Sequence, residues 1–338
     1  MKRFLIGTIV LASVTACQDS TTAPFTPATS APVALAESEA SNPIAAAVPH
    51  MYAVVALDGT LTSGRGVASV LHAGTGQYEV TFTSNVQSCG YQATTINAYS
   101  QALDVFTASG HFGSQGVFVE TKNQGGGLTD GPFNLVVTCG NDGIPFAVVD
   151  FAAQLVRGTP GVSLAYLGFG RYNVTFPTAV SSCSFIATVA DPGAGLVLAP
   201  SYVYTGSGPN ANTIYIETKN PGGGLQDGVP FHLAAICPNV VKLRYAVVRG
   251  GGTIQRANPG TTSTRPATGQ FVVTTSQNLT GCARIATRGS TNTGVPFTPA
   301  RMEIVPATSA NASGVWMRGL PVLNPAFINQ AFHLGVVC

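Results

Sequence analysis

Two segments of the sequence place a pair of carboxylates ten residues apart around three consecutive glycines. Glu120 and Asp130 flank the first run, and Glu217 and Asp227 flank the second. Carboxylates paired in this way are candidate Ca²⁺ ligands, or the candidate acid and base of a glycosidase. Glycines between strands also supply the positive φ of a tight turn, in which Asn and Asp are common. We prefer the turn interpretation and expect no cofactor, with Ca²⁺ ahead of catalysis among the alternatives.

Aromatic side chains form a second candidate site, in the strand that precedes each of these turns. Phe118, Tyr215 and Trp316 occupy equivalent positions, each two residues before a charged residue, which is Arg318 in the third case. Residues two apart in a strand share a face, and a ring beside a charge does not belong in a module core. Such a ring packs between repeats, lies under a loop or stacks on a sugar. We prefer packing or loop cover to the sugar.

Basic residues concentrate in the last third of the chain. The net charge is −3 over residues 52–139, −1 over residues 146–237 and +6 over residues 245–338. The arginines of the last segment could engage anionic glycans or lipid phosphates. The alternatives, which we prefer, are a solvated face or docking against the acidic first segment. These arginines are Arg249, Arg256, Arg265, Arg284, Arg288, Arg301 and Arg318.

Six of the seven cysteines fall into three pairs, separated by 50, 54 and 56 residues. Oxidising conditions outside the cytoplasm favour disulfides, each of which would stabilise its module by about 4 kcal/mol. Metal binding is the alternative, but the chain contains no CxxC, HxH or HxxxH spacing. The predicted bridges are Cys89 to Cys139, Cys183 to Cys237 and Cys282 to Cys338.

The cysteine pairs belong to three copies of one module. Each copy opens on an aromatic residue followed by Ala-Val-Val, has a second aromatic residue 26 positions on, and has its first cysteine 37 positions after the opening. Apolar residues alternate with polar ones after the second aromatic residue, which is the period of a strand with one buried face. His232 and His333 take the place that Asn134 has in the first copy, and we predict that they face away from the module core.

Short strands between glycine-rich turns define the expected fold class. We predict an all-β protein of three tandem, disulfide-stapled, antiparallel β-sandwich modules, jelly-roll-like, over residues 52–139, 140–237 and 238–338. Seven or eight strands and no helix are expected in each module. Linkers of six and seven residues force neighbouring modules to touch. Two arrangements stay open, a linear rod and a pseudo-threefold ring in which the three aromatic residues named above meet.

The first residues have the pattern of an export signal. Lys2 and Arg3 precede an eleven-residue apolar run, which is too short for a membrane helix. The run ends in Val14-Thr15-Ala16-Cys17, which resembles the lipobox of bacterial lipoproteins. The resemblance implies a signal peptide over residues 1–16 and a diacylglyceryl group on Cys17. Gln18 in place of Asp implies the outer membrane rather than the inner one.

Residues 17–51 then read as a disordered tether, because they are rich in Ser, Thr, Ala and Pro and show no apolar period. Within the body, the segment Gly-Thr-Gly-Gln-Tyr-Glu-Val-Thr-Phe at 74–82 resembles β modules of phage tail fibres and of secreted bacterial repeat proteins. That resemblance implies a β-sandwich that recognises or decorates surfaces, often as a trimer. The third copy departs from it at residues 265–271.

These features lead to a functional expectation. Charged residues make up 9% of the chain and hydrophobic residues 45%, a composition that fits an extracellular β protein better than a cytosolic enzyme. We expect a cell-surface lipoprotein that acts as a non-enzymatic binding or adhesion protein, with a glycan or an envelope protein as its partner besides the membrane. The alternative is a structural or assembly component of the envelope, and a polysaccharide-active enzyme ranks last. No nucleic-acid partner is expected, and the oligomeric state stays open.

Overall fold

The computed structural model describes residues 50–96, 103–195, 200–238, 240, 242–293, 300–305, 309–319 and 326–338. These residues form 24 strands and no helix, so the all-β prediction is confirmed. A helix long and apolar enough to cross a membrane is likewise absent from this described part. The predicted signal peptide, Cys17 and the tether lie outside it.

Each module contains eight strands in the same order. The first has β1 (Met51–Val55), β2 (Leu61–Arg65), β3 (Val67–Gly74), β4 (Gln77–Phe82), β5 (Gly90–Thr95), β6 (Asp104–Ser109), β7 (Gly116–Lys122) and β8 (Phe133–Thr138). The second has β9 (Phe146–Val149), β10 (Leu155–Gly158), β11 (Ser163–Tyr166), β12 (Arg171–Thr175), β13 (Ser184–Asp191), β14 (Tyr202–Ser207), β15 (Thr213–Lys219) and β16 (Phe231–Ile236). The third has β17 (Leu243–Val248), β18 (Ile254–Ala257), β19 (Thr262–Ala267), β20 (Gln270–Thr274), β21 (Ala283–Thr293), β22 (Ala300–Val305), β23 (Ala312–Gly319) and β24 (Phe332–Val337).

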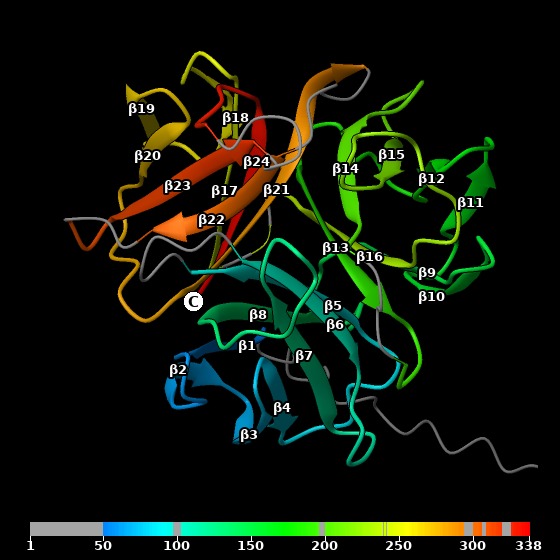
Figure 1. Cartoon of the computed structure of the whole chain (residues 1–338). Helices are drawn as coiled ribbons and strands as arrows, with labels where there is room; N and C mark the ends of the chain where they lie inside the picture. The colour runs from blue at the N-terminus through cyan, green and yellow to red at the C-terminus, as the bar shows by residue number, and fades with distance from the viewer. Residues whose placement is uncertain are drawn as a thin grey trace, which may run out of the picture. The chain divides into compact units, whose positions relative to one another are not determined.

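Within a module the strands form two four-stranded antiparallel sheets, which we name the inner and the outer sheet (Figure 1). The inner sheets have the orders β2-β1-β8-β5, β10-β9-β16-β13 and β18-β17-β24-β21. The outer sheets have the orders β3-β4-β7-β6, β11-β12-β15-β14 and β19-β20-β23-β22. The three predicted disulfides are present, and each joins the start of the edge strand of an inner sheet to the end of its neighbour.

A separate hydrophobic core fills each sandwich. The alternating residues Tyr78, Val80 and Phe82 all point into the first of these cores and have no exposed surface. One edge-to-face pair of aromatic rings recurs at equivalent positions, with centroids 5.1 to 5.2 Å apart. The pairs are Tyr78 with Phe133, Tyr172 with Phe231, and Phe271 with Phe332.

A fourth core lies between the modules and explains the almost continuous apolar runs of β8, β16 and β24. All six residues of each of these strands are buried, because one face packs inside its own sandwich and the other faces the neighbouring modules. Residues of all three modules share this fourth core, among them Val136, Ile236 and Ile285. The strands β8, β16 and β24 of the inner sheets are therefore buried on both faces.

Strand pairing joins the modules in a closed cycle. β6 of the first module pairs in parallel with β13 of the second, and β14 of the second pairs in parallel with β21 of the third. A parallel bridge between Ile304, on β22, and Ile96, which follows β5, returns from the third module to the first. Parallel pairing across modules was not predicted from the sequence, which indicated antiparallel strands within each module.

This cycle decides between the two arrangements that the linker lengths left open. A rod would keep the first and third modules apart, whereas β5, β13 and β21 contact one another pairwise and residues Ala45–Cys338 form one unit. The modules are therefore related by a pseudo-threefold axis, which passes between these three strands (Figure 1).

Steric crowding explains why a glycine occupies the turn before the second aromatic residue of each module. Gly76, Gly170 and Gly269 have φ values of 65 to 66°, in the left-handed region. A Cβ at Gly76 would lie 2.5 Å from the carbonyl oxygen of Thr121, so the close approach of the turn requires a residue without a side chain. The backbone N–H of Gly76 donates to Asp130, and that of Gly170 donates to Asp227, both at 2.5 Å.

We expect Gly170→Ala to lower the free energy of unfolding by about 3 kcal/mol or more, because a new Cβ would meet the carbonyl oxygens of Gln226 and Thr218 in addition to the backbone strain. Gly168→Ala is the matched control. Gly168 also has positive φ, but a Cβ there would have nothing within 4 Å, so the loss should be about 1 kcal/mol. Denaturant unfolding measures both, and equal losses would contradict the steric argument.

Candidate functional site

The junction of the three modules is lined by polar side chains at equivalent positions. Thr94, Thr188 and Thr287 lie on the edge strands of the inner sheets, where backbone groups need partners beyond their own sheet. Each threonine hydroxyl accepts a hydrogen bond from an alanine N–H of the neighbouring module, at 2.8 to 2.9 Å. The same hydroxyl donates back to the carbonyl of that alanine. Three identical reciprocal contacts therefore surround the axis.

A second set of equivalent residues explains the two buried histidines. The Nδ1 atom of His232 accepts from the N–H of Tyr91 at 2.9 Å, and Nδ1 of His333 accepts from the N–H of Phe185 at 2.8 Å. Asn134 makes the third contact of the cycle. All three side chains reach out of their own module and into the next, away from the core as the sequence predicted.

Burial lowers the pKa of both histidines. It takes the pKa of His333 to about 3 and that of His232 well below its ordinary value, and the nearby Arg256 and Arg157 guanidinium groups add to the respective shifts. Both rings are therefore neutral at physiological pH. Their neutrality leaves Nδ1 free to act as an acceptor.

A third set connects each module to the first cysteine segment of its neighbour. Nε of Arg157 donates to the carbonyl of Cys89 at 2.9 Å, and Nε of Arg256 donates to the carbonyl of Cys183 at 2.7 Å. Ser63 has the equivalent position in the first module, and its hydroxyl donates to the carbonyl of Gly281 at 2.5 Å. The contact between the third and first modules thus uses smaller side chains than the other two.

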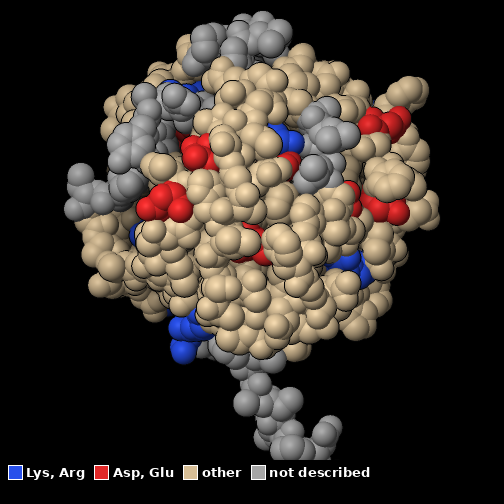
Figure 2. All heavy atoms as spheres, turned by 60° about the horizontal axis from the view of Figure 1, so that its bottom comes forward, with Lys and Arg blue, Asp and Glu red and all other residues tan. Residues whose placement is uncertain are grey.

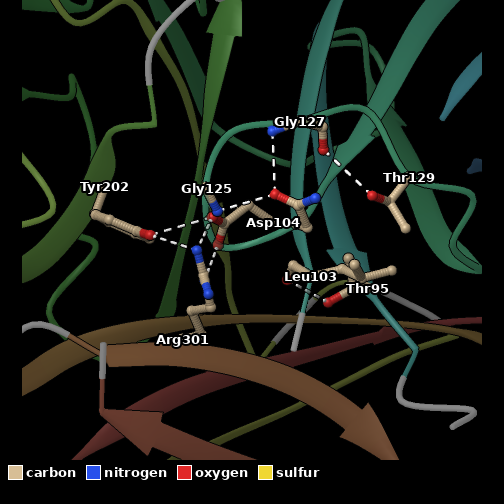
Figure 3. Close-up of polar contacts among 9 residues, drawn as sticks. Thr95, Leu103, Asp104, Gly125, Gly127, Thr129, Tyr202 and Arg301 are labelled. Atoms are coloured by element: carbon tan, nitrogen blue, oxygen red, sulfur yellow. Dashed lines mark hydrogen bonds and ion pairs between the residues drawn. The ribbon is translucent and has the colours of Figure 1, made fainter. Parts of the chain in front are cut away.

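Near the axis, one charged or phenolic side chain from each module meets in a single cluster (Figure 3). Arg301 donates from Nε to Oδ1 of Asp104 at 2.6 Å and from Nη2 to Oδ2, and Nη2 also donates to the hydroxyl of Tyr202 at 2.9 Å. The Tyr202 hydroxyl donates to Asp104 at 3.1 Å. Because all three residues are at most 9% exposed, this is a desolvated ion pair with a bidentate geometry.

The environment of this cluster shifts its pKa values. Burial raises the pKa of Asp104, although the Arg301 guanidinium opposes the rise. Burial also works against the charged form of Arg301, but the Asp104 carboxylate more than offsets this and raises its pKa. Burial and the same carboxylate raise the pKa of Tyr202.

A cavity of about 100 Å³ lies beside the cluster and is lined by all three modules. Its wall includes the cluster itself, the three axial threonines, Tyr204 and Arg288. The volume corresponds to about three molecules of liquid water. This axial cavity is large enough for a small ligand.

A second candidate site is an exposed group of apolar residues on the second module, which we call the second-module patch. It comprises Phe151, Tyr166, Leu167, Phe169 and Leu225, with exposed fractions of 39 to 71%. Asp227 positions part of it, because it accepts from the Tyr166 hydroxyl at 2.7 Å as well as from Gly170. The carbonyl of Phe151 lies near Gly228, the next residue along the chain.

Phe169 is the most exposed member of this patch, at 71%, and has a φ of 49°. A bulky residue with positive φ is strained, and such residues concentrate at functional sites.

Charged side chains are sparse on the surface of the molecule. On the face shown in Figure 2, acidic and basic side chains stand in small, separate groups.

The carboxylates singled out in the sequence have separate structural partners. Glu120 pairs with Lys122 at 2.9 Å, and Glu217 pairs with Lys219 at 2.9 Å. Asp130 and Asp227 instead hold the turn glycines, as described above, which fits the turn interpretation. Among the described residues no three His, Cys, Asp or Glu side chains gather as a metal site.

The three aromatic residues that would meet at the axis in the ring arrangement instead each pack within their own module. Phe118 is buried and stacks on His111 with centroids 3.9 Å apart, and Tyr215 packs against the Tyr202 and Tyr204 rings. Trp316 lies 5.6 Å from the ring of Phe327 and beside Arg318. Arg318 in turn pairs with Glu303 at 3.5 Å. The axis is therefore lined by the threonines and the ion pair instead.

The arginines of the third module are mostly covered. Of the seven in residues 245–338, only Arg249 and Arg265 are exposed. The others are partly or fully buried, and two of them, Arg256 and Arg301, bind the second and first modules respectively. Docking against the acidic first module, one of the preferred alternatives, is thus realised by the Arg301 pair with Asp104.

Sequence reasoning missed the axial threonines, Arg157 and the second-module patch. The threonines occur five residues after the first cysteine of every module, and this shared spacing was the available signal.

Comparison with known proteins adds nothing to these assignments, since no family model, no curated protein and no solved structure matches the chain.

Proposed function

We propose that this chain is a lipoprotein of the cell envelope, anchored through Cys17 to the outer membrane, that binds neutral glycans without catalysis. The second-module patch is the proposed binding surface. The anchor rests on the lipobox and the tether, and the three disulfides fit an extracytoplasmic location.

The observation that carries the glycan proposal is the exposed Phe169 ring on a strained turn. Aromatic rings are the groups on which the apolar faces of sugars stack, and Tyr166 lies in the same hairpin with its hydroxyl held by Asp227. Exposed apolar patches bordered by polar residues mark interaction sites. The scarcity of exposed charge favours a neutral ligand over an acidic one.

The equivalent turns of the other modules provide an internal contrast. Thr75 stands in the place of Phe169 in the first module and Thr268 in the third. All three turns share the glycine with positive φ one residue later, but Phe169 itself also has positive φ, whereas Thr75 and Thr268 do not. The exposed ring and the strained backbone thus occur together in the second module alone, which supports a role in binding.

The test is binding of the full-length chain to an array of neutral and acidic polysaccharides and to intact bacterial cells. Phe169→Asn removes the ring and places a residue that tolerates positive φ, so it should weaken binding by tenfold or more without lowering the unfolding midpoint. Leu71→Thr, an exposed residue of the first module, is the control and should bind like the wild type.

Two results would count against this function. One is glycan binding that Phe169→Asn leaves unchanged. The other is the absence of any glycan ligand together with stable capture of envelope proteins, which would favour the alternative of a structural or assembly component.

A further inference from the structure

Six strands end a sheet without a further strand beside them in the described part of the chain. They are β2, β3, β10, β11, β18 and β19, since the other two end strands, β5 and β22, meet through the bridge between Ile96 and Ile304. A free sheet edge presents unpaired backbone N–H and C=O groups, and proteins protect such edges with bulges, prolines or charged side chains. An edge that lacks all three protections is open to pairing with another chain.

Five of these six edges are protected. Strands β2, β3, β10, β18 and β19 each have a register shift against the neighbouring strand. All of them except β3 also contain an arginine, and β19 contains Pro266 as well. In contrast, β11 has the uncharged sequence Ser-Leu-Ala-Tyr and pairs with β12 in regular register over all four residues. Of the six, β11 is therefore the unprotected edge, at the outer end of its sheet (Figure 1).

The backbone of β11 directs its free groups outward at two residues. The N–H of Leu167 donates to the carbonyl of Arg171, on β12, at 2.8 Å. Hydrogen-bonded residues alternate along an antiparallel strand, so the backbone of Ala165 also bonds to β12. The N–H and C=O groups of Leu164 and Tyr166 then point away from β12, towards the free edge.

The side chains of β11 complement those of a second, antiparallel copy of the strand. Leu164 packs against the core of the second module, and the ring of Tyr166 lies 5.5 Å from that of Tyr172 in the same core. Both side chains are thus on the core side of the sheet, and Ala165 is on the opposite side. If two copies run antiparallel about a twofold axis at Ala165, Leu164 of each faces Tyr166 of the other. This contact removes apolar surface of Tyr166, which is 48% exposed, from water, and no like charges meet.

We propose that β11 is a self-association site through which two copies of this chain form a reversible dimer. The two strands pair antiparallel, with about four hydrogen bonds from the outward groups of residues 164 and 166. Because so short an edge makes few bonds, we expect the dimer to dissociate on dilution. The Phe169 ring of the glycan proposal lies in the turn beyond the paired residues, so either proposal can fail without the other.

Sedimentation velocity of the full-length chain over about two decades of concentration measures this association. Cys17→Ser in every sample removes the residue of the proposed lipid group. We expect a monomer–dimer equilibrium that Ala165→Lys weakens at least tenfold, because two like charges would then face each other at the axis. Ala73→Lys, the same substitution on an exposed alanine of β3, is the matched control and should dimerise like the parent chain. A chain that stays monomeric at every concentration, or a dimer that tolerates Ala165→Lys, would overturn the proposal.

Oxidative cross-linking tests the register of the pairing. Residues directly opposite each other in a non-hydrogen-bonded pair have Cα atoms about 4.5 Å apart, within reach of a disulfide. Ala165→Cys should therefore give a covalent dimer. Ser163→Cys, equally exposed and on the same face of the strand, is opposite Leu167 of the other copy and should not. Equal cross-linking of the two variants, or cross-linking of Ala165→Cys to a different protein in place of a second copy, would overturn the proposal.

Discussion

Replacement of Asp104 by alanine is expected to lower the free energy of unfolding by about 3 to 5 kcal/mol. The substitution removes the carboxylate that accepts two hydrogen bonds from Arg301 and one from Tyr202. Arg301 is 3% exposed, and the adjacent cavity of about 100 Å³ is too small to restore its full hydration. The cost is therefore that of a buried charge left without its counter-ion, rather than that of one lost hydrogen bond.

The combined variant Asp104→Leu, Tyr202→Phe and Arg301→Met separates the cost of an unpaired buried charge from the cost of altered packing. It replaces the whole cluster by apolar groups of similar size, so we expect a stability within about 1 to 2 kcal/mol of the wild type. Urea unfolding in a buffer without carboxylate or phosphate measures the free energy of unfolding of Asp104→Ala and of the combined variant. A loss below about 1 kcal/mol for Asp104→Ala would mean that the pair is solvated, and a combined variant as unstable as the single one would mean that packing is at fault.

The elements of each module could be predicted because their signals are local. The alternation around Tyr78 specifies a strand with one buried face, and the regular positions of the cysteines specify the disulfides. These signals act within one module of about 90 residues and repeat three times, so that each copy supports the interpretation of the others. Strand number and bridge pairing followed from them.

The assembly of the modules was only partly predictable. His232 and His333 could be recognised as facing outwards, but their acceptor role depends on the edge strand of another module. Thr188 reads as an ordinary strand residue, and nothing in its neighbourhood indicates that its hydroxyl bonds the backbone of β5. Side-chain direction follows from the period of a strand, whereas the partner follows from the three-dimensional fold.

Charge was the least reliable sequence signal for the site. The arginines of the third module suggested a basic surface, but Arg301 and Arg288 line an interior cavity. Isolated arginines are rarely buried, so the sequence offers no signal for an interior position. The Asp104 partner, 197 positions away, could not be assigned without the fold. Phe169 was missed because, in the sequence, its position between two glycines looks like that of an ordinary turn residue.

The second large effect expected is a loss of stability in mild acid that originates at the two buried histidines. The folded pKa of His333 is about 3, against about 6.5 in an unfolded chain, and that of His232 is also lowered by burial. A lowered pKa means that the unfolded state binds more protons, so stability is fully present above pH 6.5 and falls as the pH is lowered towards 3. For His333 alone the loss reaches about 3 kcal/mol at pH 4.5.

Protonation is unfavourable at these sites for two geometric reasons. A proton on Nδ1 of His333 would remove its acceptor for the N–H of Phe185. It would also place a positive charge near Arg256, whose guanidinium lies against the same neighbouring module. The third contact of the cycle is made by Asn134, which does not titrate. Acid is therefore expected to weaken two of the three module contacts selectively.

The variant His232→Asn with His333→Asn tests this directly, because it copies the residue that the first module already uses at the same position. Unfolding free energies of this variant and of the wild type, measured from pH 7.5 to 4.5, should converge as the pH falls, since only the wild type loses the histidine contribution. Taking the difference removes the opposite effect of buried acids such as Asp142 and Glu79, whose pKa values are raised by burial. His111→Asn, on an exposed histidine, is the control. Parallel pH profiles for the wild type and the double variant would show that the two rings do not carry the acid sensitivity.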